Sequence, residues 1–152
     1  MKRLFTLLFA IICGLGCLYA QTDSKNARTA EEYLESGCFV LVLDEATDMK
    51  TQTNRPMYSS RIEVDGKVGS VIWGSGDKII SKNHWNDNLT DKTAKVEISG
   101  KKAKRFSIEI DNAFNRGYRI EGELDAEGRC NGRIYYYNEV FCTYKGHITG
   151  LK

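Results

Sequence analysis

The fold of this chain is decided by residues 104–151, which read KRFSIEIDNAFNRGYRIEGELDAEGRCNGRIYYYNEVFCTYKGHITGL. Within it, residues 105–111 alternate strictly, with Phe106, Ile108 and Ile110 on one face and charged or hydroxyl side chains on the other. A period of two residues is typical of a strand with one buried and one solvent-facing side. Three similar runs follow, separated by short polar turns: 118–125, 132–137 and 140–148. The stretch therefore predicts four sequential antiparallel strands.

Further strands are predicted before this meander. Residues 38–43 form a continuous apolar run, which indicates a central strand or one covered on both faces. Residues 58–64 and 67–73 flank Asp65-Gly66, a dipeptide that suits a two-residue hairpin turn. Shorter strand signals occupy residues 78–81 and 93–99.

A helix is expected before the first strand. Thr22 or Asp23 is placed to cap this helix, and Gly37 is placed to end it. Residues 44–56 are polar, uneven and contain the only proline, so a loop is expected there. The fold class is therefore mainly β, with one N-terminal helix plus about eight antiparallel strands forming a curled sheet, a partly open barrel or a sandwich. Closure would remove exposed edges, and a barrel of this size either fills itself with side chains or holds one small ligand.

The N-terminal segment has the organisation of an export signal. Lys2 and Arg3 form a basic start, residues 4–12 form an apolar core, and the segment ends on a small residue, Ala20. The apolar run is too short to serve as a transmembrane anchor.

One domain boundary and a compartment follow from that signal. We expect residues 1–20 to be a signal peptide, residues 21–152 to be a single β-rich domain, and the mature protein to be periplasmic or extracellular. The alternative is a lipoprotein acylated at Cys17, behind Gly16.

The charge of the domain is balanced. The full chain has 22 Lys and Arg residues against 20 Asp and Glu, a formal net charge of +2. Because Lys2 and Arg3 belong to the predicted signal, the remaining domain has a formal charge of zero. Its one basic run, at residues 101–105, coincides with a predicted turn, so nucleic acid is not expected as a partner.

The domain has an odd number of cysteines: Cys38, Cys130 and Cys142. An odd count permits at most one internal disulfide. If Asn138-Glu139 is a two-residue turn, Cys142 lies opposite Tyr135, so a bridge from Cys142 to Cys130 across that hairpin is not expected. A bridge from Cys38 to one of the others and three free thiols both remain open.

Three stretches together resemble a family of small exported domains of unknown function from Bacteroides-like bacteria. They are ESGCFV at 35–40, YSSRIEVDGKV at 58–68 with Trp73-Gly74 after it, and FCTYKGHI at 141–148. The chain departs from this family at residues 81–89, where the family often has a loop rich in glycine and tyrosine. The resemblance implies a fold of antiparallel strands and no settled activity.

The polar residues 82–91 carry the strongest candidates for catalysis. His84 with Asp87 could form the base of a hydrolase, but the sequence places no nucleophile, and a solvated loop histidine is the favoured interpretation. Asp87 and Asp91 offer oxygen ligands for calcium, without the required glycine and bidentate glutamate. His147 is predicted to face solvent. We therefore expect no catalytic residue, metal site or cofactor.

Aromatic residues are the most suggestive part of the composition. They combine a broad apolar face with a polar tip, as binding surfaces do, although ordinary cross-strand packing is the simpler explanation. If Ile134 and Tyr136 face inwards, Tyr135 and Tyr137 form an exposed pair. The candidate ligand-binding residues are Trp73, Trp85, Tyr135, Tyr137 and Tyr144.

The leading functional hypothesis is a non-enzymatic binding module of the cell envelope, lipocalin-like in taking a small apolar or amphipathic ligand within the sheet. It rests on the strand count, the export signal and the aromatic content. The alternative is a protein-interaction or accessory domain with a solid core, which uses an exposed aromatic sheet face or edge. A hydrolase using His84 and Asp87 ranks third.

Overall fold

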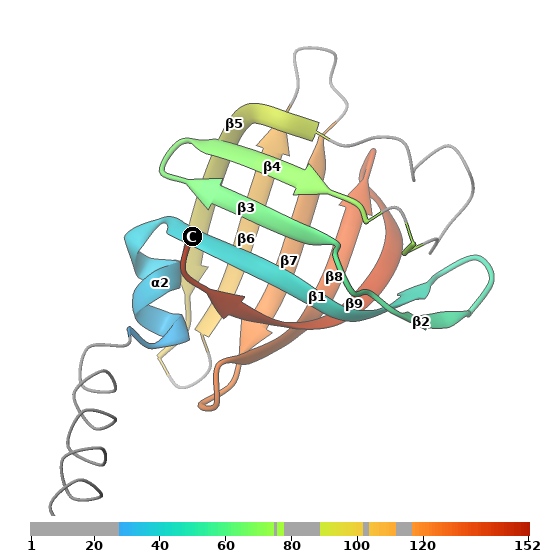
Figure 1. Ribbon diagram of the computed structural model, residues 1–152, viewed down its shortest axis with the longest axis horizontal. Coiled ribbons are helices and arrows are strands. Elements are labelled where there is room, and N and C mark those ends of the chain that lie inside the picture. Colours follow the sequence, from blue (N-terminus) through green and yellow to red (C-terminus); the bar gives the residue numbers. More distant parts are fainter. Residues whose placement is uncertain (1–27, 75, 78–88, 102–103, 112–116) are drawn as a thin grey trace, which may run out of the picture.

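A computed structural model describes residues 28–74, 76–77, 89–101, 104–111 and 117–152, which form one short helix and nine strands (Figure 1). The predicted signal segment and its alternative acylation site lie outside the described residues. The elements are α2 (Ala30–Ser36), β1 (Cys38–Asp48), β2 (Asn54–Pro56), β3 (Arg61–Asp65), β4 (Val68–Ile72), β5 (Leu89–Ser99), β6 (Lys104–Asp111), β7 (Tyr118–Leu124), β8 (Arg129–Tyr136) and β9 (Glu139–Thr149).

Eight of the strands close into an antiparallel barrel. Each strand from β3 to β9 pairs with its neighbours in sequence, and β1 pairs with β3 on one side and with β9 on the other. The ninth strand, β2, pairs with β1 at residues 45–47, beyond the point where the pairing with the start of β3 stops at Val42. The prediction of a mainly β fold of antiparallel strands is confirmed, and the architecture is a lipocalin-like barrel with one additional strand.

The middle of the barrel is filled by its own side chains. Alternate residues of each strand face inwards, and Phe39, Leu41, Ile62, Ile108 and Ile120 are all 0% exposed. An eight-stranded barrel has an interior just wide enough for such side chains. A ligand therefore cannot occupy the middle of the barrel without displacing this core.

One layer of the core is built around two glycines. Phe106, Gly122, Gly132 and Tyr144 lie in register on four consecutive strands, β6 to β9. The rings of Phe106 and Tyr144 occupy the space beside Gly122 that a side chain would otherwise fill. The Tyr144 hydroxyl donates a hydrogen bond of 3.3 Å to the backbone carbonyl of Glu121. Aromatic rings that cover glycines in this way fix the register of neighbouring strands.

Helix α2 packs at one end of the barrel, where β1 begins and β9 ends (Figure 1). Its Leu34 is 1% exposed. The helix begins after Thr29, whose hydroxyl accepts from the Glu32 amide while the Glu32 carboxylate accepts from the Thr29 amide. The expected cap at Thr22 or Asp23 is therefore wrong for this helix, because this reciprocal capping box starts the helix later. The predicted end at Gly37 is confirmed, with φ of 69°.

The expected loop over residues 44–56 is largely wrong. Strand β1 continues to Asp48, and residues 54–56 form β2. A bulge between Leu43 and Glu45 moves the inward positions from odd to even residue numbers, so Ala46 and Asp48 are buried. Because the bulge changes which residues face inwards, the strict alternation of the first half of β1 does not continue into its second half. The sequence pattern therefore does not reveal that second half as a strand.

Two hairpin turns lie one residue away from their predicted positions. The first turn is centred on Gly66-Lys67, with Gly66 at φ of 62°, as a turn with glycine first requires. The second is centred on Tyr137-Asn138, where both residues have positive φ, 51° and 63°. Strand register is set by which side chains must face the core, and that requirement overrides the local turn signal.

The three cysteines of the domain are free thiols. Cys142 lies opposite Ile134, and Cys130 lies opposite Gly146, so the two are not cross-strand partners. Burial raises the pKa of the Cys130 thiol to about 12 and raises the pKa of Cys142 as well. In the part of the chain that the structure describes, no helix has the length and apolar character needed to cross a membrane.

Candidate functional site

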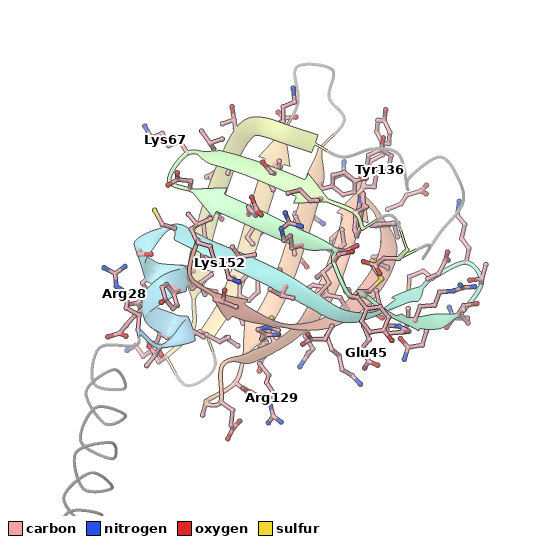
Figure 2. All side chains as sticks on the ribbon, viewed as in Figure 1. Arg28, Glu45, Lys67, Arg129, Tyr136 and Lys152 are labelled. Atoms are coloured by element: carbon pink, nitrogen blue, oxygen red, sulfur yellow. The ribbon has the colours of Figure 1, made fainter. Side chains whose placement is uncertain are left out.

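Five aromatic side chains form a connected group, here called the aromatic cluster, at the end of the barrel opposite α2. They come from strand ends that meet there: the end of β4, the start of β7, the end of β8, the following turn and the start of β9. Figure 2 labels one member, Tyr136, on the far side of the barrel from the helix. The members are Trp73, Tyr118, Tyr136, Tyr137 and Phe141.

Ring contacts run through the cluster without a break. The Trp73 ring lies 5.7 Å from Phe141 and 6.0 Å from Tyr118, measured between centroids, in edge-to-face arrangements. Tyr118 lies 4.9 Å from Tyr136, which lies 4.6 Å from Tyr137. Such geometry stabilises aromatic pairs beyond the effect of buried area alone.

The aromatic cluster extends from the interior of the barrel to its surface. Tyr118 and Trp73 are 2% and 6% exposed, Tyr136 and Phe141 are partly buried, and Tyr137 is 52% exposed. An apolar path therefore leads from the filled core to the rim. At the opposite end of the barrel, the helix α2 packs where β1 begins and β9 ends.

A buried carboxylate fixes the chain around Trp73. Asp77 is 3% exposed and accepts hydrogen bonds from the amides of Tyr58, Ser59 and Ser60 at 2.9–3.0 Å, and from both serine hydroxyls. The Ser60 hydroxyl in turn accepts from the Gly74 amide at 2.9 Å. The segment before β3 is thus tied to the segment that follows Trp73.

The charge of Asp77 is maintained by these donors. Burial alone would raise the pKa of this carboxyl, but the hydrogen bonds from Ser59, Ser60 and Tyr58 outweigh burial and hold the pKa below its ordinary value. The sequence gives no sign of this link, because its partners lie far apart in the chain and share no motif.

The candidate ligand-binding residues from the sequence are not brought together as one site. Trp73 and Tyr137 both belong to the aromatic cluster, at its buried and exposed ends. Tyr144 lies inside the barrel, beside the two glycines. Tyr135 faces outwards, where its hydroxyl donates to Glu121 and the Arg119 guanidinium lies 4.2 Å from its ring centroid. Trp85 lies outside the described residues.

Three members of the aromatic cluster were not among those candidates: Tyr118, Tyr136 and Phe141. The sequence considers an inward Tyr136 only as a condition for exposing Tyr135 and Tyr137; in the structure Tyr136 lies opposite the buried Tyr118. Phe141 faces the cluster because β9 has an irregularity opposite Ile134 and Tyr135. A signal was present in the sequence, since each of these residues stands at a predicted strand end.

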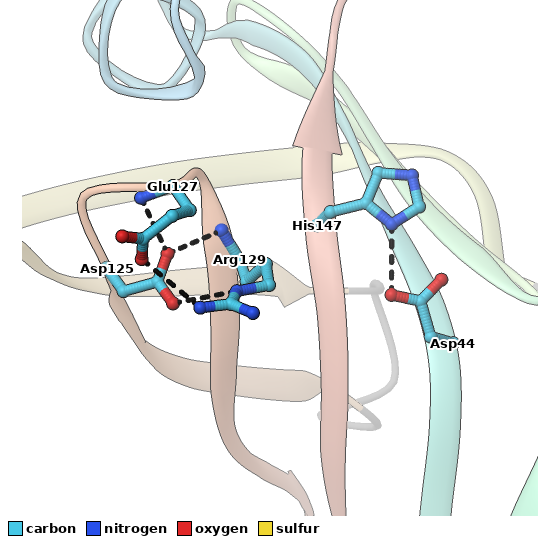
Figure 3. Close-up of polar contacts among 5 residues, drawn as sticks. All are labelled: Asp44, Asp125, Glu127, Arg129 and His147. Carbon is cyan, nitrogen blue, oxygen red and sulfur yellow. Dashed lines mark hydrogen bonds and ion pairs between the residues drawn. The ribbon is translucent and has the colours of Figure 1, made fainter.

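Of the residues considered for catalysis, the structure describes the side chain of His147. His84 and Asp87, with the calcium candidate Asp91 beside them, lie in a stretch whose side chains are outside the described residues. His147 lies on the outer surface, with Nδ1 3.0 Å from an oxygen of Asp44 (Figure 3).

A second polar group flanks His147 on the same outer surface. Arg129 lies opposite His147 on β8, and its guanidinium pairs with Asp125 and Glu127 (Figure 3). These exposed contacts hold the β7–β8 turn and the start of β8 together.

Comparison with known proteins supplies no family. No family model matches the chain, and no curated protein matches it. The resemblance carried by residues 35–40, 58–68 and 141–148 therefore stays a prediction.

Proposed function

We propose that this protein is a non-enzymatic binding module of the cell envelope, which takes a small apolar or amphipathic ligand at the aromatic end of its barrel. The observation that carries the proposal is the aromatic cluster, which leads from the buried Trp73 to the exposed Tyr137. Binding sites for small molecules combine apolar and aromatic walls with a few polar groups, and the mouths of β-barrels are a common place for them. The placement in the envelope rests on the predicted export signal.

The filled core limits where such a ligand can lie. Because the inward side chains of the middle layers are fully buried, the ligand must insert among the rings at the rim and not deep in the barrel. Flat apolar groups suit this position, since they stack on aromatic faces. Tyrosine hydroxyls at the rim offer hydrogen bonds to a polar end of the ligand, which is why an amphipathic ligand fits.

The test uses N-phenyl-1-naphthylamine, a flat apolar probe whose fluorescence rises in apolar sites. The expected result is saturable binding, weakened at least fivefold by Tyr137→Ala at the rim. Tyr135→Ala is the matched control, because Tyr135 lies on the outer wall near the same strand end and is no member of the aromatic cluster. Equal binding by both variants would contradict the proposal.

Native mass spectrometry tests whether the protein carries a natural ligand. We expect native mass spectrometry of protein purified from its own envelope to show an excess mass that disappears on denaturation. Identical native and denatured masses in preparations that still bind the probe would mean that the site is empty when purified. Identical masses without probe binding would exclude the proposal.

A protein partner at the same end is the second candidate function. Two rim residues favour it, since Tyr58 is 85% exposed and Tyr137 is 52% exposed. Exposed aromatic residues are enriched in protein interfaces. Tyr58→Ala separates the two functions: it should release a co-purifying envelope protein and leave binding of the small probe unchanged.

A further inference from the structure

The outer wall of the barrel has two hollows that lie away from the aromatic cluster. We propose that Arg133 binds the carboxylate of a small polar molecule there. The site is independent of the proposed function at the barrel end, and neither proposal needs the other.

Arg133 stands where two hollows of the outer wall meet. The smaller hollow, of about 410 Å³, lies between β8, β9, β1 and β2. The larger one, of about 1010 Å³, extends over β5, β6, β7 and β8. Asn131, Gly132 and Arg133 line both of them, so a molecule bound at Arg133 has room on either side.

The acidic residue nearest in register to Arg133 is engaged by other groups. Glu121 lies directly opposite on β7, but one of its oxygens accepts from the Tyr135 hydroxyl at 3.0 Å and the other lies 3.2 Å from Arg119 Nε. On the other side, Thr143 is the cross-strand neighbour of Arg133. No ion pair or side-chain hydrogen bond is made by Arg133 within the described residues.

The situation of Arg133 differs from that of most other basic residues on the barrel wall. Seven described lysines and arginines of the barrel strands are ion-paired: Arg61, Lys95, Lys104, Arg105, Arg119, Arg129 and Lys145. A guanidinium presents five N–H donors in a planar fork that matches a carboxylate with two parallel hydrogen bonds. Arg133 therefore offers a complete set of donors to a ligand.

The charges around Arg133 favour a ligand that carries a single negative charge. In the smaller hollow, Arg133 and Lys145 face only one carboxylate, Glu45, which pairs with Lys145 and accepts from the Asn54 amide. The balance there is one positive charge.

The larger hollow has the opposite balance. Glu97, Glu121 and Glu123 outnumber Arg105 and Arg133 in its lining. A second negative charge on the ligand would be repelled on this side. The ligand class that fits is a monocarboxylate whose remainder carries hydroxyl, amide or ammonium groups.

The test is a titration of the ¹⁵N-labelled protein, followed by amide chemical shifts, with sodium gluconate as the probe. Gluconate carries one carboxylate and several hydroxyls. A single exposed ion pair contributes little, so we expect a dissociation constant on the order of 1 mM. The amides of residues 131–133 and 143 should shift, and Arg133→Gln should weaken binding at least threefold.

Arg61→Gln is the matched control, because Arg61 lies on strand β3, lines neither hollow and is paired with Glu63. It should change the affinity less than twofold, and thermal unfolding of both variants checks that the fold is intact. Equal effects of the two substitutions would overturn the proposal. If glucose binds as tightly as gluconate, the charge of the carboxylate does not contribute to binding and the proposal is overturned. If inorganic phosphate binds more tightly than gluconate, the assignment of the site to a carboxylate is overturned.

Discussion

Single residues decide the geometry of the barrel at the layer of Gly122 and Gly132. Both glycines are in register, and the ring of Tyr144 crosses them to reach the Glu121 carbonyl. A side chain at position 122 would meet the buried rings of Phe106 and Tyr144. At position 132, the obstacle is the Glu121 backbone itself.

Gly132→Ala should destabilise the protein by about 3 kcal/mol or prevent folding, because overpacking against backbone forces strands apart. Urea unfolding followed by circular dichroism measures the effect. Gly76→Ala is the control, since no heavy atom lies within 4 Å of an added methyl group there. Equal unfolding midpoints for the two variants would show that the layer tolerates an added side chain.

Asp77→Asn should lower the free energy of unfolding by about 2 kcal/mol at pH 7, because hydrogen bonds to a charged acceptor are worth more than neutral ones. The pKa of Asp77 is lower in the folded protein than in the unfolded chain. Its stabilising contribution is therefore complete above the ordinary aspartate value of about 3.9 and is lost as pH falls through the folded pKa. Unfolding measured between pH 3 and 7 should show this acid loss in the wild type.

The exposed Asp111 supplies the matched substitution for that experiment. Asp111→Asn should leave the stability at pH 7 close to that of the wild type, because Asp111 is exposed. An Asp77→Asn profile that coincides with the Asp111→Asn profile would mean that the five hydrogen bonds contribute nothing to stability.

Among the elements, α2 depends most on a local signal. Thr29→Ala removes the hydroxyl that accepts a hydrogen bond from the Glu32 amide in the capping box. The substitution should lower the free energy of unfolding by about 1 kcal/mol, seen as a lower thermal unfolding midpoint. Arg28→Ala, an exposed change one residue earlier, should have little effect. If the Thr29 variant unfolds at the wild-type temperature, contacts of the helix with the barrel, and not its cap, hold the helix in place.

The elements also show how far the sequence leads and where it stops. Alternation identified the strands of residues 104–149, because each has one buried and one solvated face. It failed after Leu43, where a bulge changes the phase, and it placed the turns near Gly66 and Asn138 one residue away. The pairing register of the strands cannot be read from local sequence patterns, because it is decided by the core that distant strands form together.

The candidate site was predicted less well than the fold. Trp73 and Tyr137 were identified by residue type, but the three residues that connect them were not. Their contacts depend on closure of the sheet, which brings β4, β7 and β9 to one rim. The Asp77 hydrogen bonds and the unpaired state of Arg133 likewise depend on neighbours that only the folded chain supplies.

At the scale of the whole molecule, the barrel is a closed wall around two buried thiols. Cys130 and Cys142 are 3% and 0% exposed, whereas Cys38 is partly exposed near α2. Thiols react as thiolates, and burial raises the pKa of both buried cysteines.

Iodoacetamide at pH 8 should therefore modify Cys38 in the native protein and leave Cys130 and Cys142 intact. With added urea, the two buried thiols should become reactive over the same concentration range, because they report opening of one cooperative barrel. Peptide mapping assigns the labelled sites, and Cys38→Ser removes the fast reaction. Separate transitions for Cys130 and Cys142 would show that the barrel opens in parts.

The pairing of β1 with β9 also determines when the barrel can close during synthesis of the chain. The ribosome makes β1 long before β9, so one edge of β1 has no partner until β9 has been synthesised. Contacts between such distant segments slow folding and leave a nascent chain unclosed. For a chain with a predicted export signal, that delay is useful, because a polypeptide that has not yet closed can still be threaded through a narrow channel.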